Sequence, residues 1–161
     1  MNMAGMGFDA LVAHKVNQDK ERHQTSKAVY IKNLVTSLIE SQSQPYKIVI
    51  DDKKIKEDIF SMCVGIGKYN GGGMMQAPNA VPDDGIFDIT LIRKISKTDV
   101  ITNVKNLYDG SFVSHLSVAL MRGQEIYIEA PKKVSLEADG ESLGYPPFEY
   151  EILPRSLCVI V

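Results

Sequence analysis

The sequence predicts a mainly β domain with some α structure: a two-layer, antiparallel, β-sandwich-like fold with one long and one or two short helices. Three observations lead to this prediction. The C-terminal third holds only strand-like runs separated by turns, one stretch near residue 30 has strong helical periodicity, and residues 1–161 suit a single domain. A chain of this length buries roughly two-thirds of its unfolded surface.

The N-terminal segment begins with the small residues 4–7, for which we expect a loop, followed by an apolar run that contains Asp9. Aspartate ahead of an apolar helical run is a common N-cap, so Asp9 is interpreted as the cap of a helix over 10–16. The polar and charged residues 17–24 are expected to form a solvated loop or the beginning of the next helix.

The clearest helix covers residues 26–41. Its apolar residues recur at the spacing i, i+3, i+4, i+7 and i+8 and form one stripe: Ile31, Leu34, Val35, Leu38 and Ile39. Thr25 or Ser26 is available as the N-cap, and the segment 42–45 ends the helix. We expect the stripe to pack on a sheet and to form part of the core.

From residue 46 onward the apolar pattern becomes that of strands. A strand over 46–50 leads through the Asp51-Asp52 turn into 55–66, which is either a strand pair or one bent strand. A short helix capped by Ser96 is expected over 97–107. The other predicted strands are 86–92, 116–121, 125–129, 134–138, 148–153 and 157–161.

Composition and charge exclude some classes of protein. Hydrophobic residues make up 44% of the chain and charged residues 24%, which are ordinary values for a globular protein, so disorder is not indicated. The net charge of −2 argues against nucleic acid as a partner, because phosphate binding normally requires clustered positive charge.

The cysteines indicate a reducing compartment. Cys63 and Cys158 lie in apolar strand-like runs without the spacing of metal ligands, and both are interpreted as reduced core residues of a cytoplasmic protein. The three histidines fall on different expected elements, which argues against a histidine metal site. No apolar run approaches the roughly 18 residues of a membrane-spanning helix, so we expect any membrane contact to be peripheral, at the inner face.

Two sharp glycine turns carry paired acids. Asp83 and Asp84 precede Gly85 in a segment that also contains three consecutive glycines, and Asp139-Gly140-Glu141 forms the second turn. Each turn alone is also consistent with a simple connection bearing solvated acids. Folding alone does not require paired acids in both turns. Their presence in both therefore favours a functional role.

Four motifs follow one another along the chain: GMGFDA at 5–10, NGGGMMQAPNAVPDDGIFDI at 70–89, DGE at 139–141 and EILPRSL at 151–157. In series they resemble the C-terminal domain of the diacylglycerol kinase and sphingosine kinase superfamily of lipid kinases, the bacterial diacylglycerol-kinase-like members in particular. One position departs from the pattern: Gly65 stands where the family often has asparagine, eight residues before the last of the three glycines.

The resemblance implies that these 161 residues are the lipid-side, C-terminal half of a kinase. The nucleotide-binding half, with its GGDGT loop, is expected to lie outside this sequence, and the 161 residues alone are expected to be inactive. The whole enzyme would use ATP and Mg²⁺ to phosphorylate the hydroxyl of diacylglycerol or a related long-chain lipid alcohol.

The resemblance also implies roles for single residues. Asp139 stands where the family places a carboxylate that faces the γ-phosphate, with Glu141 beside it and Gly140 close to the nucleotide. Whether Asp139 is the catalytic base or contacts nucleotide or metal stays open. Asp9 lies near the cleft, where it would meet the lipid head group.

A second implied site is a magnesium site on the loop before residue 86. Its ligands would be the Asp84 carboxylate and the carbonyl oxygens of Val81 and Ile86, a set of hard oxygen donors that suits this cation. Such a site would be regulatory or structural, because it lies away from the chemistry.

Other interpretations remain. The chain is alternatively a non-catalytic lipid-binding or regulatory module, or an NAD-kinase-like domain. An apolar slot for an acyl chain is expected inside the β layer, next to Met74, Met75 and the helical stripe. The oligomeric state stays open, with a homodimer among the alternatives.

Overall fold

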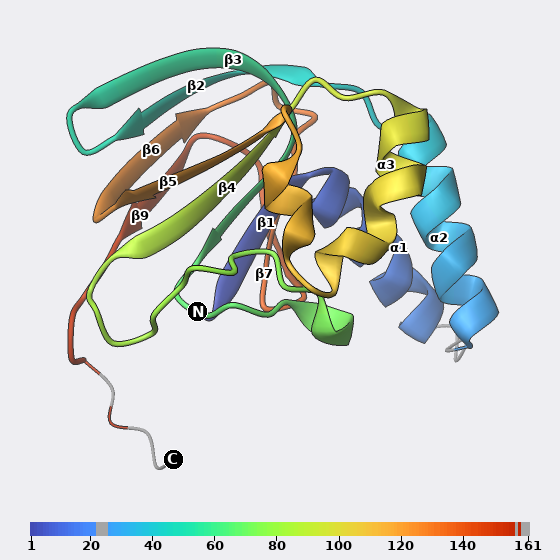
Figure 1. Cartoon of the computed structure of the whole chain (residues 1–161), viewed down its shortest axis with the longest axis horizontal. Coiled ribbons are helices and arrows are strands. Elements are labelled where there is room, and N and C mark those ends of the chain that lie inside the picture. Colours follow the sequence, from blue (N-terminus) through green and yellow to red (C-terminus); the bar gives the residue numbers. More distant parts are fainter. Residues whose placement is uncertain (22–25, 157, 159–161) are drawn as a thin grey trace.

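The computed structural model describes residues 1–21, 26–156 and 158 and shows a curled antiparallel sheet with helices gathered at one end (Figure 1). The fold is mainly β, as predicted. The helices are α1 (Phe8–Glu21), α2 (Lys27–Glu40), α3 (Lys97–Asn103) and the 3-10 turns η1 (Gly71–Gly73), η2 (Val104–Leu107) and η3 (Ser111–Ser114). The strands are β1 (Met3–Gly7), β2 (Gln44–Ile50), β3 (Lys53–Gly65), β4 (Phe87–Arg93), β5 (Val118–Gly123), β6 (Glu125–Glu129), β7 (Leu136–Ala138), β8 (Glu141–Gly144) and β9 (Phe148–Glu151).

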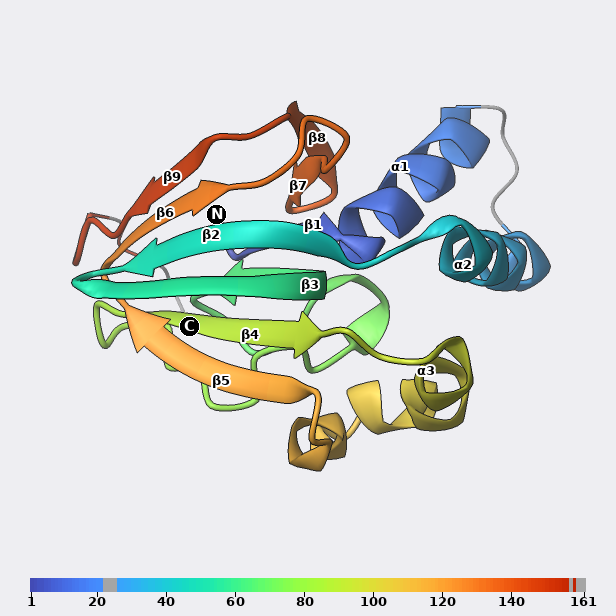
Figure 2. The same ribbon diagram turned by 90° about the horizontal axis from the view of Figure 1, so that it is seen from above.

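The two layers predicted from the sequence are parts of one sheet. Its nine strands pair in the order β8-β7-β1-β3-β2-β6-β9, with β4 and β5 continuing from β3. The long strand β3 is the branch point, because β2 pairs with residues 53–59 and β1 with residues 61–65. The sheet then curls on itself, so that it resembles a sandwich without being divided into separate sheets (Figure 2).

The main core fills the inside of this curl. Alternate residues of β2 point inward, so Tyr46, Ile48 and Ile50 are buried while their neighbours face outward. Met62 of β3 and Ile128 of β6 meet them there. Of the two alternatives for 55–66, the single strand is correct: β3 covers Lys53–Gly65, and its pairing with β4 has an irregularity between Ile59 and Ser61.

The strand β1 replaces the loop predicted over 4–7. It lies between β3 and β7, where Gly5 is paired in register with Cys63 on one side and Glu137 on the other. Small residues and methionine carry no strand signal in the sequence, but they let three backbones approach closely in the middle of a sheet. Gly7 ends the strand with a φ of +73° and turns the chain into α1.

The first helix is longer than predicted. α1 starts at Phe8, so Asp9 lies in its first turn and is not an N-cap, which corrects the prediction. The helix continues to Glu21 through most of the segment 17–24 for which a loop was one alternative. The remaining part of that segment, 22–24, lies outside the described residues.

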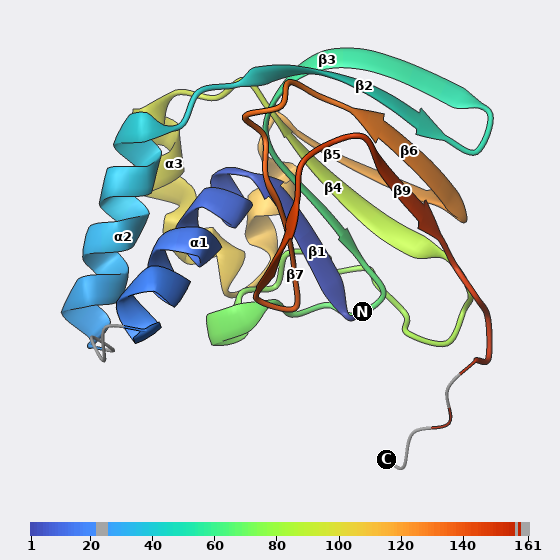
Figure 3. The same cartoon turned by 180° about the vertical axis from the view of Figure 1, so that it is seen from behind.

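The second helix confirms its predicted cap and corrects its predicted face. The Ser26 hydroxyl accepts a hydrogen bond from the Val29 backbone N–H. Of the apolar stripe, Leu38 is buried, but Ile31, Val35 and Ile39 are 59%, 44% and 64% exposed. α2 packs mainly on α1 (Figure 3), and only the Leu34–Leu38 side of the stripe reaches Phe60 of the sheet. The buried face of α2 therefore includes the polar Asn33 and Ser37, while Ile31, Val35 and Ile39 face outward.

The C-terminal half follows the prediction with shifted bounds. Ser96 caps α3 through the Asp99 backbone N–H, as expected. The strand β8 was not predicted, and the predicted strand 157–161 lies outside the described residues except for Cys158. Cys158 is exposed, which corrects its assignment to the core, whereas Cys63 is buried as predicted.

Candidate functional site

A deep apolar cleft lies between the helices and the end of the sheet. One part, about 660 Å³ including its open mouth, is bounded by α1, β3, β4 and the α3–η3 segment. A second part, about 1410 Å³ on the same measure, extends between α1, α2, η1 and α3. The two parts form one cleft because they share the lining residues Phe8, Asp9, Val100, Val104 and Leu107.

Apolar side chains from the helices and from β3 form the walls of the cleft. Phe8 of α1 stacks on Phe60 of β3 with the ring centroids 5.0 Å apart, and Leu38 of α2 completes this small core. Met74, expected beside an acyl slot, lines the wider part. This apolar cleft lies between helices and sheet, whereas the acyl slot was expected inside the β layer.

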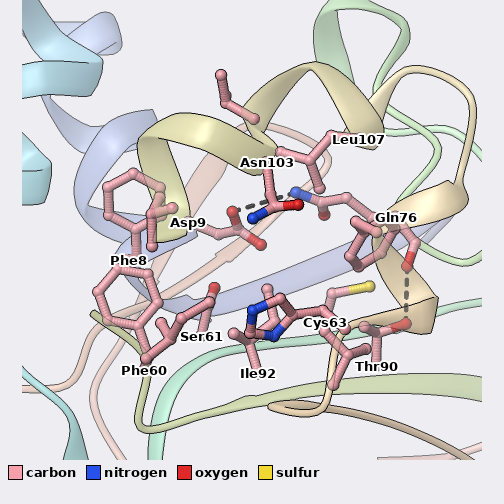
Figure 4. Close-up of a pocket in the computed structure, with 16 residues that line it drawn as sticks. Phe8, Asp9, Phe60, Ser61, Cys63, Gln76, Thr90, Ile92, Asn103 and Leu107 are labelled. Carbon is pink, nitrogen blue, oxygen red and sulfur yellow. Dashed lines mark hydrogen bonds between the residues drawn. The ribbon is translucent and has the colours of Figure 1, made fainter. Parts of the chain in front are cut away.

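Asp9 stands at the polar base of the cleft (Figure 4). Its Oδ1 accepts a hydrogen bond of 3.1 Å from Gln76 Nε2, and Gln76 Oε1 accepts one of 3.1 Å from Asn70 Nδ2. The Thr90 hydroxyl donates to the Gln76 carbonyl oxygen at 2.7 Å and so fastens this loop to β4. The glycine-rich loop thus brings the Gln76 amide to the acid, and Asn70 holds Gln76 in place.

Glu137 of β7 faces Asp9 across β1. A Cβ atom on Gly5 would lie 2.7 Å from Glu137 Oε1 and 2.9 Å from Asp9 Cβ, so only glycine fits between the two acids. Burial, with a smaller contribution from the Glu137 charge, raises the pKa of Asp9 to about 7, against hydrogen bonds from Gln76 and Ser61. Burial also raises the pKa of Glu137, opposed by the Gly140 backbone N–H.

The residues that line the two parts of the cleft include no lysine and no arginine. His115 is the basic side chain among them, and it lines only the narrower part. The polar base is therefore acidic without a balancing cation in the described chain. Such a base favours hydrogen-bond donors and disfavours anions.

The turn that follows β7 is anchored to the start of β1. Asp139 Oδ1 accepts hydrogen bonds of 3.0 Å from the Asn2 and Met3 backbone N–H groups, and Oδ2 accepts a second one of 3.0 Å from Asn2. Glu137 Oε2 accepts from the Gly140 N–H at 2.9 Å. The structure thus brings Gly140 to the cleft wall and Asp139 next to it, while Glu141 is exposed on β8.

The loop with Asp84 is held elsewhere, against β5. Asp84 Oδ1 accepts from the Ile86 N–H at 3.1 Å, its Oδ2 pairs with the Arg122 guanidinium, and the Val81 carbonyl accepts from the Asp84 N–H at 3.3 Å. Arg122 Nε also lies 3.4 Å from Asp88 Oδ2. Within the described part of the chain, no cluster of three or more His, Cys, Asp or Glu is placed to hold a metal ion.

A family model described as "YegS C-terminal NAD kinase beta sandwich-like domain" matches residues 2–161. The chain belongs to this family. Membership agrees with the curled, sandwich-like sheet and confirms the resemblance drawn from the four motifs.

The relatives of this YegS C-terminal domain are lipid kinases by name. A diacylglycerol kinase of Mycobacterium tuberculosis (strain CDC 1551 / Oshkosh) is 27% identical over 159 residues, covering 98% of this chain and 50% of its own length. A "Probable lipid kinase YegS-like" of Shewanella frigidimarina is 28% identical over 163 residues, with 98% and 50% covered. The chain spans about half the length of the curated relatives it matches.

Solved structures show the same fold. A chain from Bacillus anthracis str. Sterne superposes with a TM-score of 0.66 at 22% identity, covering 95% of this chain and 49% of that one. A crystal structure of a diacylglycerol kinase from the same organism gives a TM-score of 0.58 at 19% identity, with 95% and 46% covered. In the described residues, no helix has the length and apolar character needed to cross a bilayer.

Sequence reasoning missed three polar residues of the site. Gln76 and Asn70 lie inside the glycine-rich motif, but their side chains carry no signal of their own there. Glu137 lies in the predicted strand 134–138 and carries no signal there that points to Asp9.

Proposed function

We propose that this YegS C-terminal domain is the lipid-binding half of an ATP-dependent kinase. The kinase phosphorylates the hydroxyl of diacylglycerol or a related long-chain lipid alcohol. The observation that carries the proposal is the apolar cleft with the half-buried Asp9 and the buried Glu137, and with no lysine or arginine among its lining residues. The names of the relatives support it, because they are diacylglycerol kinases and YegS-like lipid kinases.

The cleft fits a neutral lipid with an alcohol head group. Its apolar walls would cover the acyl chains, and its base would accept hydrogen bonds from head-group hydroxyls through Asp9 and Glu137. A fatty acid or a phospholipid phosphate would bring negative charge against these two acids. Asp9 is thus proposed to orient the attacking hydroxyl, as the resemblance implied.

The phosphate side of the reaction is assigned to the turn after β7. ATP and Mg²⁺ would be held mainly by the nucleotide-binding half, and the cation would offset the charge of the phosphates. Asp139 and Glu141 would face that half from this domain, with Gly140 keeping the turn close to the lipid cleft. The hydrogen bonds from the Asn2 and Met3 backbone N–H groups fix the Asp139 carboxylate in place relative to β1.

Transfer of labelled phosphate tests this function. A protein that joins this domain to a nucleotide-binding half is expected to move the γ-phosphate of ATP to dioctanoylglycerol, and the 161-residue chain alone is expected to bind that lipid without turnover. Binding without turnover in the joined protein would support the lipid-binding module instead. Phosphorylation of NAD in place of lipid would support the NAD-kinase-like alternative.

Asp9→Asn is expected to weaken dioctanoylglycerol binding at least about tenfold and to stabilise the fold at pH 8. The pKa of Asp9 is about 7 in the folded chain against an ordinary 3.8, so the folded state holds the proton more tightly than the unfolded state. Wild-type stability therefore falls as pH rises from about 4 to 7, and the asparagine variant escapes this loss. Its Tm should exceed that of wild type at pH 8 and match it near pH 4.

The exposed acid Asp109 offers the control, because its side chain lies on the surface and its pKa is lowered by the Ser111 hydroxyl. Asp109→Asn should leave lipid binding unchanged and should not raise the Tm at pH 8. An Asp9→Asn variant with normal lipid affinity would show that the head group does not reach the base of the cleft.

Mg²⁺ is proposed to bind the loop through Asp84 and the carbonyl oxygens of Val81 and Ile86. These oxygens are of the type that Mg²⁺ prefers, but the Arg122 guanidinium already balances the Asp84 charge, so the cation has to compete with it. At ten times its Kd, Mg²⁺ should stabilise the domain by about 1.4 kcal/mol, or about 3–6 °C in Tm. Arg122→Gln should enlarge the shift and Asp84→Ala should abolish it.

Differential scanning calorimetry with and without MgCl₂ measures this shift. Asp83→Ala is the matched control, because the prediction assigns no ligand role to that neighbouring acid. Equal Mg²⁺ shifts in wild type and Asp84→Ala would remove the loop as a magnesium site.

A further inference from the structure

We propose that the outer face of α2, together with Ile101 of α3, docks on an anionic lipid membrane and places the cleft mouth against the bilayer. This inference rests on the proposed function, because it concerns how a membrane lipid reaches the cleft. The docking face, called the rim patch below, consists of Ile31, Val35, Ile39 and Ile101, which are 59%, 44%, 64% and 60% exposed.

The rim patch is a continuous line of side chains. Ile31, Val35 and Ile39 follow one another at i, i+4 and i+8, so they lie above one another on one face of α2. The opposite face is occupied by α1, where Asn33 Nδ2 donates to Asp19 Oδ2 at 2.7 Å. Contiguous apolar side chains on a surface mark a contact site, whereas single ones are ordinary.

The rim patch is also the edge of the cleft. Val35 and Ile101 both line its wider part while remaining exposed. The Lys97 ammonium donates to the Ile39 carbonyl oxygen, which ties the beginning of α3 to the end of α2 on either side of the mouth. The two helices stand together at the end of the molecule opposite the turn between β2 and β3 (Figures 1 and 3).

Because the rim patch adjoins the mouth of the cleft, we infer that a membrane binds to it. A long-chain lipid alcohol is dissolved in a bilayer, and its acyl chains have to pass from there into the cleft. An apolar rim pressed into the bilayer lets them pass without exposure to water. A protein partner on the same face would close the mouth through which the lipid enters.

The charges around the patch suit an anionic surface. Three exposed lysines flank it on α2, α3 and η2: Lys32, Lys97 and Lys105. Of the acids on these elements, Glu40 is paired with Lys15 at 2.8 Å, and Asp99 accepts a hydrogen bond of 2.7 Å from the Ser96 hydroxyl. Lysines beside an apolar face are the pattern of helices that lie in the membrane interface.

Sedimentation of the chain with phosphatidylcholine vesicles containing phosphatidylglycerol tests the surface. The double variant Ile31→Ser/Ile39→Ser leaves the cleft lining intact and should bind these vesicles at least about tenfold more weakly than wild type. The control Leu143→Ser/Leu153→Ser removes two leucines that are 60% and 66% exposed on β8 and after β9, and should bind like wild type. Lys32→Gln should lower the affinity about fivefold, and pure phosphatidylcholine should bind more weakly.

Binding of monomeric dioctanoylglycerol, measured by titration calorimetry, distinguishes membrane docking through the rim patch from lipid binding in the cleft. The Ile31→Ser/Ile39→Ser variant should bind this soluble lipid like wild type. Vesicle binding that depends on the rim patch, in a chain that does not bind dioctanoylglycerol, would support the surface and refute the lipid-kinase function. Equal vesicle binding by wild type and variant, or a dimer that the variant dissociates without any vesicle binding, would overturn the docking proposal.

Discussion

Asp139→Asn, in a protein that joins this domain to a nucleotide-binding half, is expected to lower kcat by on the order of 10²–10⁴ with little change in the KM for lipid. The substitution keeps the shape of the side chain and removes its charge. One oxygen remains to accept from the Asn2 and Met3 N–H groups, so the anchor on β1 loses only the contact of the second oxygen with Asn2. The loss of activity would then report chemistry and not unfolding.

The kinetic constants distinguish two roles for Asp139. If its carboxylate takes the proton of the lipid hydroxyl, kcat falls and saturating substrates do not restore it. If it contacts nucleotide or metal, the KM for ATP or Mg²⁺ rises and part of kcat returns at saturation. Glu141→Gln should have a smaller effect, because the role proposed for Glu141 is to position Asp139. A wild-type kcat in Asp139→Asn would mean that this turn is only a hairpin.

Gly7→Ala is expected to destabilise the fold by about 3–4 kcal/mol and to lower Tm by about 10 °C. Gly7 has a φ of +73°, where a Cβ atom costs roughly 1–2 kcal/mol. That Cβ would also lie 2.6 Å from the Phe60 carbonyl oxygen, which belongs to the backbone of β3 and can move only if the central strands separate. Thermal unfolding followed by circular dichroism measures the loss.

Gly72→Ala is the matched control for this stability effect. Gly72 has nearly the same φ, +77°, but a Cβ there would meet no atom within 4 Å. Its Tm should therefore fall by no more than about 5 °C, the effect of backbone strain alone. Similar losses in the two variants would show that the contact with Phe60 relaxes easily.

The sequence predicts helices and strands here better than it predicts what each one touches. The cap on Ser26 and the periodicity of 26–41 are local properties, and both are confirmed. The burial of the stripe is not local: it depends on α1 lying between α2 and the sheet, which left Ile31 and Ile39 facing outward. β1 was missed because its glycines and methionines are selected by the close approach of three strands.

The family motifs led to some of the residues near the cleft. Asp9 and Gly140 both line it and Asp139 adjoins Gly140, while the roles given to these residues stay predictions and the acid partner of Asp9 was missed. Glu137 reads in sequence as an ordinary charged strand residue, and only the pairing of β7 with β1 places it against Asp9. Likewise, the pairing of Arg122 with Asp84 joins residues 38 apart, which no local pattern reveals.

The pairing of β1 with β7 has a consequence for biosynthesis. Ala4 pairs with Ala138, and the Met3 carbonyl accepts from the Asp139 N–H at 2.9 Å, so the middle of the sheet is closed by segments from opposite ends of the domain. On the ribosome, the first strand can pair early with β3, but it has to wait for nearly the whole domain before its second neighbour, β7, emerges. Long-range closure of this kind folds slowly and late. The acidic turn therefore takes its place only after the domain has been made, and a nascent chain without β7 carries neither the closed sheet nor the paired acids.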